Sequence, residues 1–300
     1  MPRLSLRSAF TLAAGLALAM PRATSAQFPE RDNAAHARYL ALNVLIGATT
    51  SMARAAVSGA PIGTTLRKGL IGGSLMSAGM ELVGTQSSGT RFVGLQLTAL
   101  GANITRNADA GVPMLSDVTL PIYPFYVRVR PSAQHPVTAR VSTLSAVRLA
   151  SIMTDGRRPS IDWTQTLATG APVFRSPRWR LPSASCPPPC DGAFAQHNAG
   201  MIVYSASAGT DYDLDRSLAH ESLHLAQQTR DMVLHAIPAS DAALTRLGDP
   251  GRRISRFLVV DLMQPLRFID EGELRIRGAP RRQSWYETEA RAFAPGGERR

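Results

Sequence analysis

The pattern H-E-x-x-H stands in the last third of this 300-residue chain, at His220, Glu221 and His224. On a helix, residues four positions apart lie on the same face, so the two imidazoles can bind one metal ion. The carboxylate of Glu221 then lies beside a metal ligand without pointing at the ion, where it can take a proton from an activated water. These three residues predict a metal site with hydrolytic chemistry and Glu221 as the general base.

The surrounding sequence is typical of a helix that could present this motif. Residues 210–213, T-D-Y-D, supply several candidate N-caps. Apolar residues then follow at helical spacing, namely Leu214, Leu218, Leu225 and Met232. We therefore expect a single helix that extends to about His235 and carries both histidines.

A catalytic zinc site has three protein ligands and leaves one position to water, so a third ligand must come from elsewhere in the chain. Gln227 and Arg230 stand where a metzincin would have a glycine and a third histidine, which excludes that longer motif. A glutamate further on is the remaining option. The segment 284–293, S-W-Y-E-T-E-A-R-A-F, predicts a short helix that contains Glu287 and Glu289.

The combination of H-E-x-x-H with a later E-x-E-A resembles the gluzincin branch of the zincin metallopeptidases, although the resemblance covers only these two segments. It implies hydrolysis of peptide bonds at a zinc ion held by His220, His224 and a glutamate on a later helix. Glu287 begins the E-x-x-A pattern usual for that glutamate, whereas Glu289 fits a shorter pattern and stays the alternative ligand. Arg291 replaces the acidic residue that normally orients a ligand histidine, so this role must be filled otherwise or is weaker.

Two further segments have candidate roles beside the metal. Tyr286 adjoins Glu287 and is a candidate hydrogen-bond donor to a tetrahedral oxyanion, with packing as the alternative. Residues 200–205, G-M-I-V-Y-S, predict a short strand just before the metal helix. In zincins an edge strand at this place aligns the substrate backbone by β-augmentation, and an ordinary core strand is the alternative for this segment.

The whole chain predicts an α+β fold in three parts. Residues 1–26 have the form of a secretory signal peptide, with Arg3 and Arg7 before a short apolar run and small residues at the cleavage site. Residues 27–112 predict a helical region rich in glycine and alanine. Residues 113–300, which begin with strand-like alternation, predict the zincin-like metallopeptidase domain.

The signal peptide predicts export to the periplasm or out of the cell. In that setting we expect Cys186 and Cys190, which enclose three prolines, to form a disulfide, with zinc binding as the alternative. The apolar runs of the helical region are shorter than a bilayer span and are interrupted by Asn43, Arg54 and Glu81. They favour buried helices or peripheral association with a membrane or envelope over membrane spans.

The net charge of +11 raises the question of a nucleic-acid partner. Lys68 is the only lysine, and the arginines are scattered without a basic block or interleaved aromatic residues, so we expect none. The expected partner is a peptide or protein substrate. The alternative function is an exported, envelope-associated protein without peptidase activity, whose zinc is structural or whose motif is accidental. A structural zinc would have four protein ligands, and an accidental motif would leave both glutamates far from the histidines.

Overall fold

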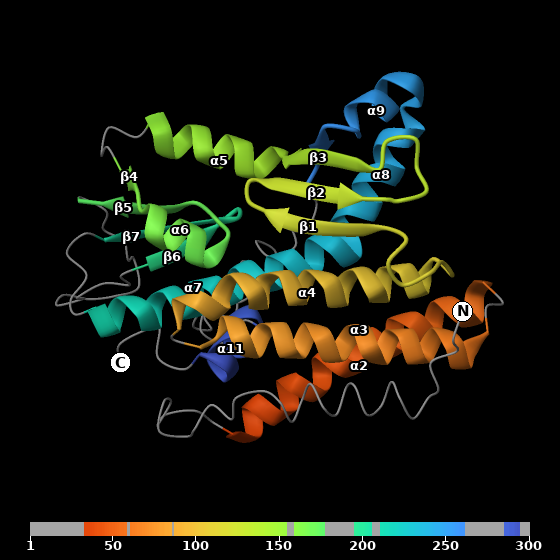
Figure 1. Cartoon of the computed structure of the whole chain (residues 1–300), viewed down its shortest axis with the longest axis horizontal. Coiled ribbons are helices and arrows are strands. Elements are labelled where there is room, and N and C mark those ends of the chain that lie inside the picture. The colour runs from red at the N-terminus through yellow and green to blue at the C-terminus, as the bar shows by residue number, and fades with distance from the viewer. Residues whose placement is uncertain are drawn as a thin grey trace, which may run out of the picture.

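The computed structural model describes residues 33–58, 61–85, 87–154, 159–177, 195–205, 211–261 and 285–294. The predicted signal peptide at residues 1–26 and the predicted disulfide between Cys186 and Cys190 lie outside these residues. The described chain has an α+β fold, with long helices and two four-stranded sheets (Figure 1). In the described part of the chain, no helix is both long enough and apolar enough to cross a membrane.

Three long helices open the described chain: α2 (Asn33–Ser58), α3 (Ile62–Val83) and α4 (Ser88–Asp109). Glycines let these helices approach closely. A Cβ atom at Gly79 of α3 would collide with the backbone nitrogen of Thr98 in α4, and one at Gly73 would lie 2.7 Å from Cα of Val44 in α2. The small residues of this region therefore serve close helix packing.

The first sheet has the strand order β1-β2-β3-β8. Its members are β1 (Val118–Ile122), β2 (Phe125–Val129), β3 (Val137–Ser142) and β8 (Leu258–Val259). The first three strands are antiparallel, and β8 joins β3 in parallel. Helix α5 (Thr143–Thr154) follows β3 directly, and this sheet lies above α4 in Figure 1.

The second sheet has the strand order β4-β5-β7-β6. Its members are β4 (Ser160–Ile161), β5 (Val173–Ser176), β6 (Ala195–Asn198) and β7 (Met201–Ser205), and helix α6 (Trp163–Thr169) connects β4 to β5. The strand predicted at residues 200–205 is β7. It lies between β5 and β6 with all its residues buried, so of the two alternatives that the sequence left open it is the ordinary core strand. Among the described strands, β6 holds the edge position instead.

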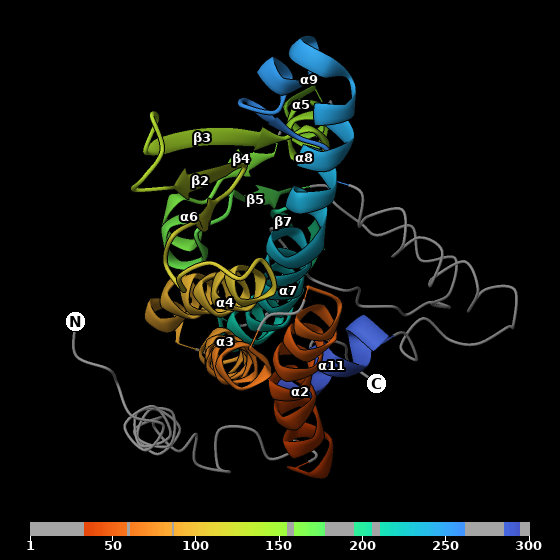
Figure 2. The same cartoon turned by 90° about the vertical axis from the view of Figure 1, so that its right-hand side faces the viewer.

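Helix α7 (Asp211–Asp231) carries the H-E-x-x-H motif and continues as a π-helical turn, η1 (Met232–Ala236). It contacts α3 and α4 as well as strands β6 and β7, and Figure 2 shows α2, α3, α4 and α7 grouped together. Because neighbours enclose it on several sides, α7 buries polar side chains such as Gln227 as completely as the apolar Leu218 and Leu223.

After η1 the chain forms α8 (Ile237–Arg246), α9 (Gly248–Ile254) and, near the end of the described chain, α11 (Trp285–Phe293). Helix α11 packs against both α7 and α2. The contacts of α11 with α2, and those of α3 and α4 with α7, cross the domain boundary predicted at residue 113. The N-terminal helices therefore help to position the helix that carries Glu287, while the domain division itself stays a prediction.

Candidate metal centre

The two histidines of the motif lie one helical turn apart on α7, as their spacing predicted. Their ring centroids are 4.9 Å apart and the ring planes are perpendicular. Only 4% of His220 and 5% of His224 is exposed. The motif therefore faces the interior of the protein, where few water molecules compete for its nitrogen atoms.

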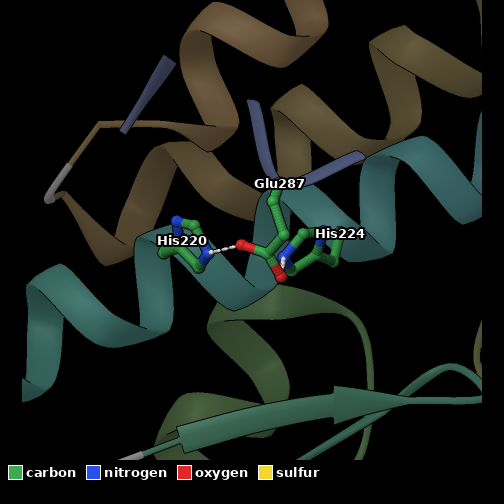
Figure 3. A group of neighbouring side chains, drawn as sticks. All are labelled: His220, His224 and Glu287. Atoms are coloured by element: carbon green, nitrogen blue, oxygen red, sulfur yellow. Dashed lines mark ion pairs between the residues drawn. The ribbon is translucent and has the colours of Figure 1, made fainter. Parts of the chain in front are cut away.

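Glu287 lies in the first turn of α11 and points its carboxylate between the two imidazoles (Figure 3). Its Oε2 is 3.4 Å from Nε2 of His220, and its Oε1 is 3.3 Å from Nε2 of His224. One donor atom from each of the three residues lies within 4.8 Å of the others, the one such group of histidine, cysteine and acidic residues found in the described part of the chain. The structure thus brings together the three residues that the sequence predicted as ligands.

Glu289, the alternative ligand, points elsewhere and is 1% exposed. Its Oε1 accepts hydrogen bonds from Arg230, at 2.8 Å, and from Asn43, at 3.0 Å. Its Oε2 accepts a hydrogen bond of 2.9 Å from the side-chain amide of Gln227. Residues two positions apart on a helix point in nearly opposite directions, so the two glutamates of α11 cannot both face the histidines.

Arg230 is buried beside Glu289, and its Nε donates a hydrogen bond of 3.1 Å to Asp231. Its guanidinium also lies 4.9 Å from the centre of the Trp285 ring. Burial alone would lower the pKa of Arg230, but the charges of Glu289 and Asp231 raise it above its usual value. This charged cluster holds α11 against α7 and so fixes the helix that carries Glu287.

The charges of the three predicted ligands are strongly coupled. Burial alone would raise the pKa of Glu287, but hydrogen bonds and attraction to His220 and His224 hold it well below its usual range. Burial would lower the pKa of His220, and the carboxylates of Glu287 and Glu221 outweigh that effect and raise it. The site therefore favours an anionic Glu287 and attracts positive charge.

Glu221 follows His220 on α7, and its carboxylate reaches strand β6. Its Oε2 accepts a hydrogen bond of 2.6 Å from the backbone N–H of His197. Burial raises the pKa of Glu221, partly opposed by attraction to the two histidines. The predicted general base is thus held in place by the strand that occupies the sheet edge among the described residues.

Tyr286 has a partner that the sequence analysis did not foresee. Its hydroxyl donates a hydrogen bond of 2.7 Å to Asp231. This bond uses the hydroxyl proton that an oxyanion donor would need, so Tyr286 serves the contact between α11 and α7.

Three residues near the site were missed by the sequence analysis. Gln227 accepts a hydrogen bond from the His224 ring, Asn43 reaches the site from α2, and the His197 ring stacks over His224 with centroids 6.4 Å apart. Gln227 could have been found, because residues three apart on a helix share a face. Asn43 and His197 are far from the motif in sequence, and no local pattern relates them to it.

No protein-family model matches the chain, and comparison with curated proteins and with solved structures gives no match either.

Proposed function

We propose that this protein is a zinc-dependent metallopeptidase, with His220, His224 and Glu287 as metal ligands and Glu221 as the general base. The observation that carries the proposal is the convergence of three donor atoms within 4.8 Å of one another, although Glu287 lies 63 residues after His224. Two imidazoles and one carboxylate are a common ligand set of catalytic zinc.

The hydrogen-bond pattern supports a cation at this point. Nδ1 of His224 lies 2.8 Å from the side-chain oxygen of Gln227, so a neutral ring carries its proton on Nδ1 and a lone pair on Nε2. That lone pair faces Oε1 of Glu287 at 3.3 Å. Two acceptors so close in a buried site repel each other unless a proton or a metal ion lies between them.

Zinc, when bound, supplies the Lewis acidity that lowers the pKa of a water molecule and polarises a substrate carbonyl. Glu221 is placed to move the proton. The N–H of His197 occupies Oε2 of Glu221, which leaves Oε1 to accept a proton from the attacking water and pass it to the leaving amine. The raised pKa of Glu221 suits a group that acts first as base and then as acid.

The geometry also supports this proposal over its alternatives. A structural zinc has four protein ligands, whereas the group formed by the described residues has three. An accidental motif would leave the glutamates far from the histidines, whereas Glu287 lies within 3.4 Å of both rings.

A peptide or protein is the substrate class that the surroundings of Glu221 favour. Strand β6 lies at the edge of its sheet among the described strands, and it contacts Glu221 through His197. An extended peptide that pairs with this edge would pass close to the general base. With the predicted signal peptide, the reaction would take place in the periplasm or outside the cell.

The test combines metal content with hydrolysis. Elemental analysis of the purified chain should give one zinc ion per molecule, and a fluorogenic peptide library should be cleaved in a chelator-sensitive reaction. The Glu221→Gln variant should keep the zinc ion and lose cleavage. Absence of bound or bindable zinc in the wild-type protein would overturn the proposal, and zinc without cleavage of any library peptide would favour the structural-zinc alternative.

A further inference from the structure

The side chain of Gln227 is completely buried and contacts three polar groups. Its Nε2 lies 2.9 Å from the backbone oxygen of Tyr286 and 2.9 Å from Oε2 of Glu289. A carbonyl oxygen and a carboxylate oxygen can only accept hydrogen bonds, so this end of the side chain is the NH₂ group. The other end, Oε1, is therefore the acceptor that faces Nδ1 of His224 at 2.8 Å.

This arrangement determines where the neutral His224 ring carries its proton. Because Oε1 of Gln227 can only accept, the proton lies on Nδ1, and the lone pair of Nε2 points toward Glu287. We infer that Gln227 is a positioning residue, which holds His224 in the tautomer and ring orientation required of a metal ligand. The contribution to metal binding rests on the proposed function, whereas the tautomer does not.

Glu289 keeps Gln227 in this orientation. One carboxylate oxygen of Glu289 accepts from Gln227, and the other accepts from Arg230 and Asn43. The charged acceptor strengthens the hydrogen bond to the amide and prevents the amide from turning round. A chain of contacts thus runs from Arg230 and Asn43 through Glu289 and Gln227 to His224, and it fills the orienting role that Arg291 cannot fill.

The experiment compares the variants Gln227→Met and Gln228→Met. Methionine keeps the length of glutamine but cannot reproduce its hydrogen bonds. Gln228 is a matched control, because it is also buried on α7 and also donates to a carboxylate, that of Asp261, at 3.3 Å. Each variant loses one buried amide, but only the change at residue 227 removes the partner of His224.

The first readout is the tautomer of His224 in metal-free protein, from ¹⁵N chemical shifts at a pH where the ring is neutral. We expect the Nδ1–H form in the wild type and in the control variant Gln228→Met. In Gln227→Met we expect a shift toward the Nε2–H form. The second readout is zinc affinity by competition with a chelator. We expect a loss of about 10–100-fold in Gln227→Met and little change in the control.

The two readouts separate failure of the inference from failure of the proposed function. A wild-type ring whose Nδ1 carries no proton would overturn the inference even if Gln227→Met did not fold. Equal zinc affinity and an unchanged tautomer in Gln227→Met would also overturn it and leave the metal site standing. A wild-type protein that has the Nδ1–H tautomer but binds no zinc would support the tautomer assignment and refute the metallopeptidase.

Discussion

Alanine substitution of the two glutamates of α11 should separate protein stability from metal binding. Glu289→Ala removes a buried partner of Arg230, whose guanidinium would stay buried beside Asp231. Breaking a buried ion pair by removing one partner costs about 3–5 kcal/mol. Because Asp231 still pairs with Arg230, we expect the lower end, about 3 kcal/mol, which lowers Tm by roughly 6–12 °C in a chain of this size.

Glu287→Ala should instead remove the stabilisation by zinc and have a smaller effect on the stability of the metal-free protein. It removes one of the three proposed metal ligands, so the stabilisation that a bound metal provides should be lost. That stabilisation is about 2.7 kcal/mol when the free zinc concentration is 100 times the Kd. In the absence of metal, Glu287→Ala should unfold at a temperature above that of Glu289→Ala, because the two histidines that pair with Glu287 can lose their charge, whereas the buried Arg230 cannot.

The assay is thermal unfolding followed by circular dichroism, with either zinc or EDTA present. Wild type should melt at a higher temperature with zinc, and so should Glu289→Ala, by a smaller margin because Glu289 also holds Gln227 against His224. Glu287→Ala should melt at the same temperature with zinc and with EDTA. Asp249→Ala is a control, because it removes a carboxylate from an exposed ion pair with Arg252 and should change stability by less than about 1 kcal/mol. The assignment of Glu287 as ligand would be refuted if Glu289→Ala lost the zinc effect and Glu287→Ala kept it.

Three further changes test separate parts of the structure. Glu221→Gln should reduce peptide turnover by at least about 100-fold with unchanged zinc content, and normal turnover would exclude Glu221 as the base. Burial and the hydrogen bond to Asp162 raise the pKa of Tyr204 to about 12, above the usual value of about 10. Tyr204→Phe should therefore cost about 1–3 kcal/mol at neutral pH, and this difference in urea unfolding should vanish between about pH 10 and 12, where the wild-type advantage is lost. Gly79→Ala should destabilise the protein by at least about 1–3 kcal/mol, because the added methyl group meets the α4 backbone. Gly63→Ala is the control, since its methyl group would have open space around it, and it should be neutral or stabilise the protein by up to about 1 kcal/mol. Similar Tm values for the two variants would contradict the close packing of α3 and α4.

The sequence by itself determined the local part of the site. Helical geometry relates residues four apart in any helix, so the spacing of His220 and His224 was enough to place both rings on one face of α7. The apolar and small-residue segments likewise predicted the N-terminal helices, and strand-like alternation predicted the α+β class. Each of these inferences depends on neighbours within a few residues along the chain.

The tertiary structure decided what distant segments do to one another. Whether Glu287 or Glu289 faces the histidines depends on how α11 is rotated against α7, and the rotation is set by buried contacts with Arg230 and Asn43. Periodicity cannot give this rotation, because it depends on partners that are 59 and 246 residues away from Glu289. For the same reason the sequence of β7 left an edge strand and a core strand open, since the pairing of a strand is decided by segments that its own sequence does not contain.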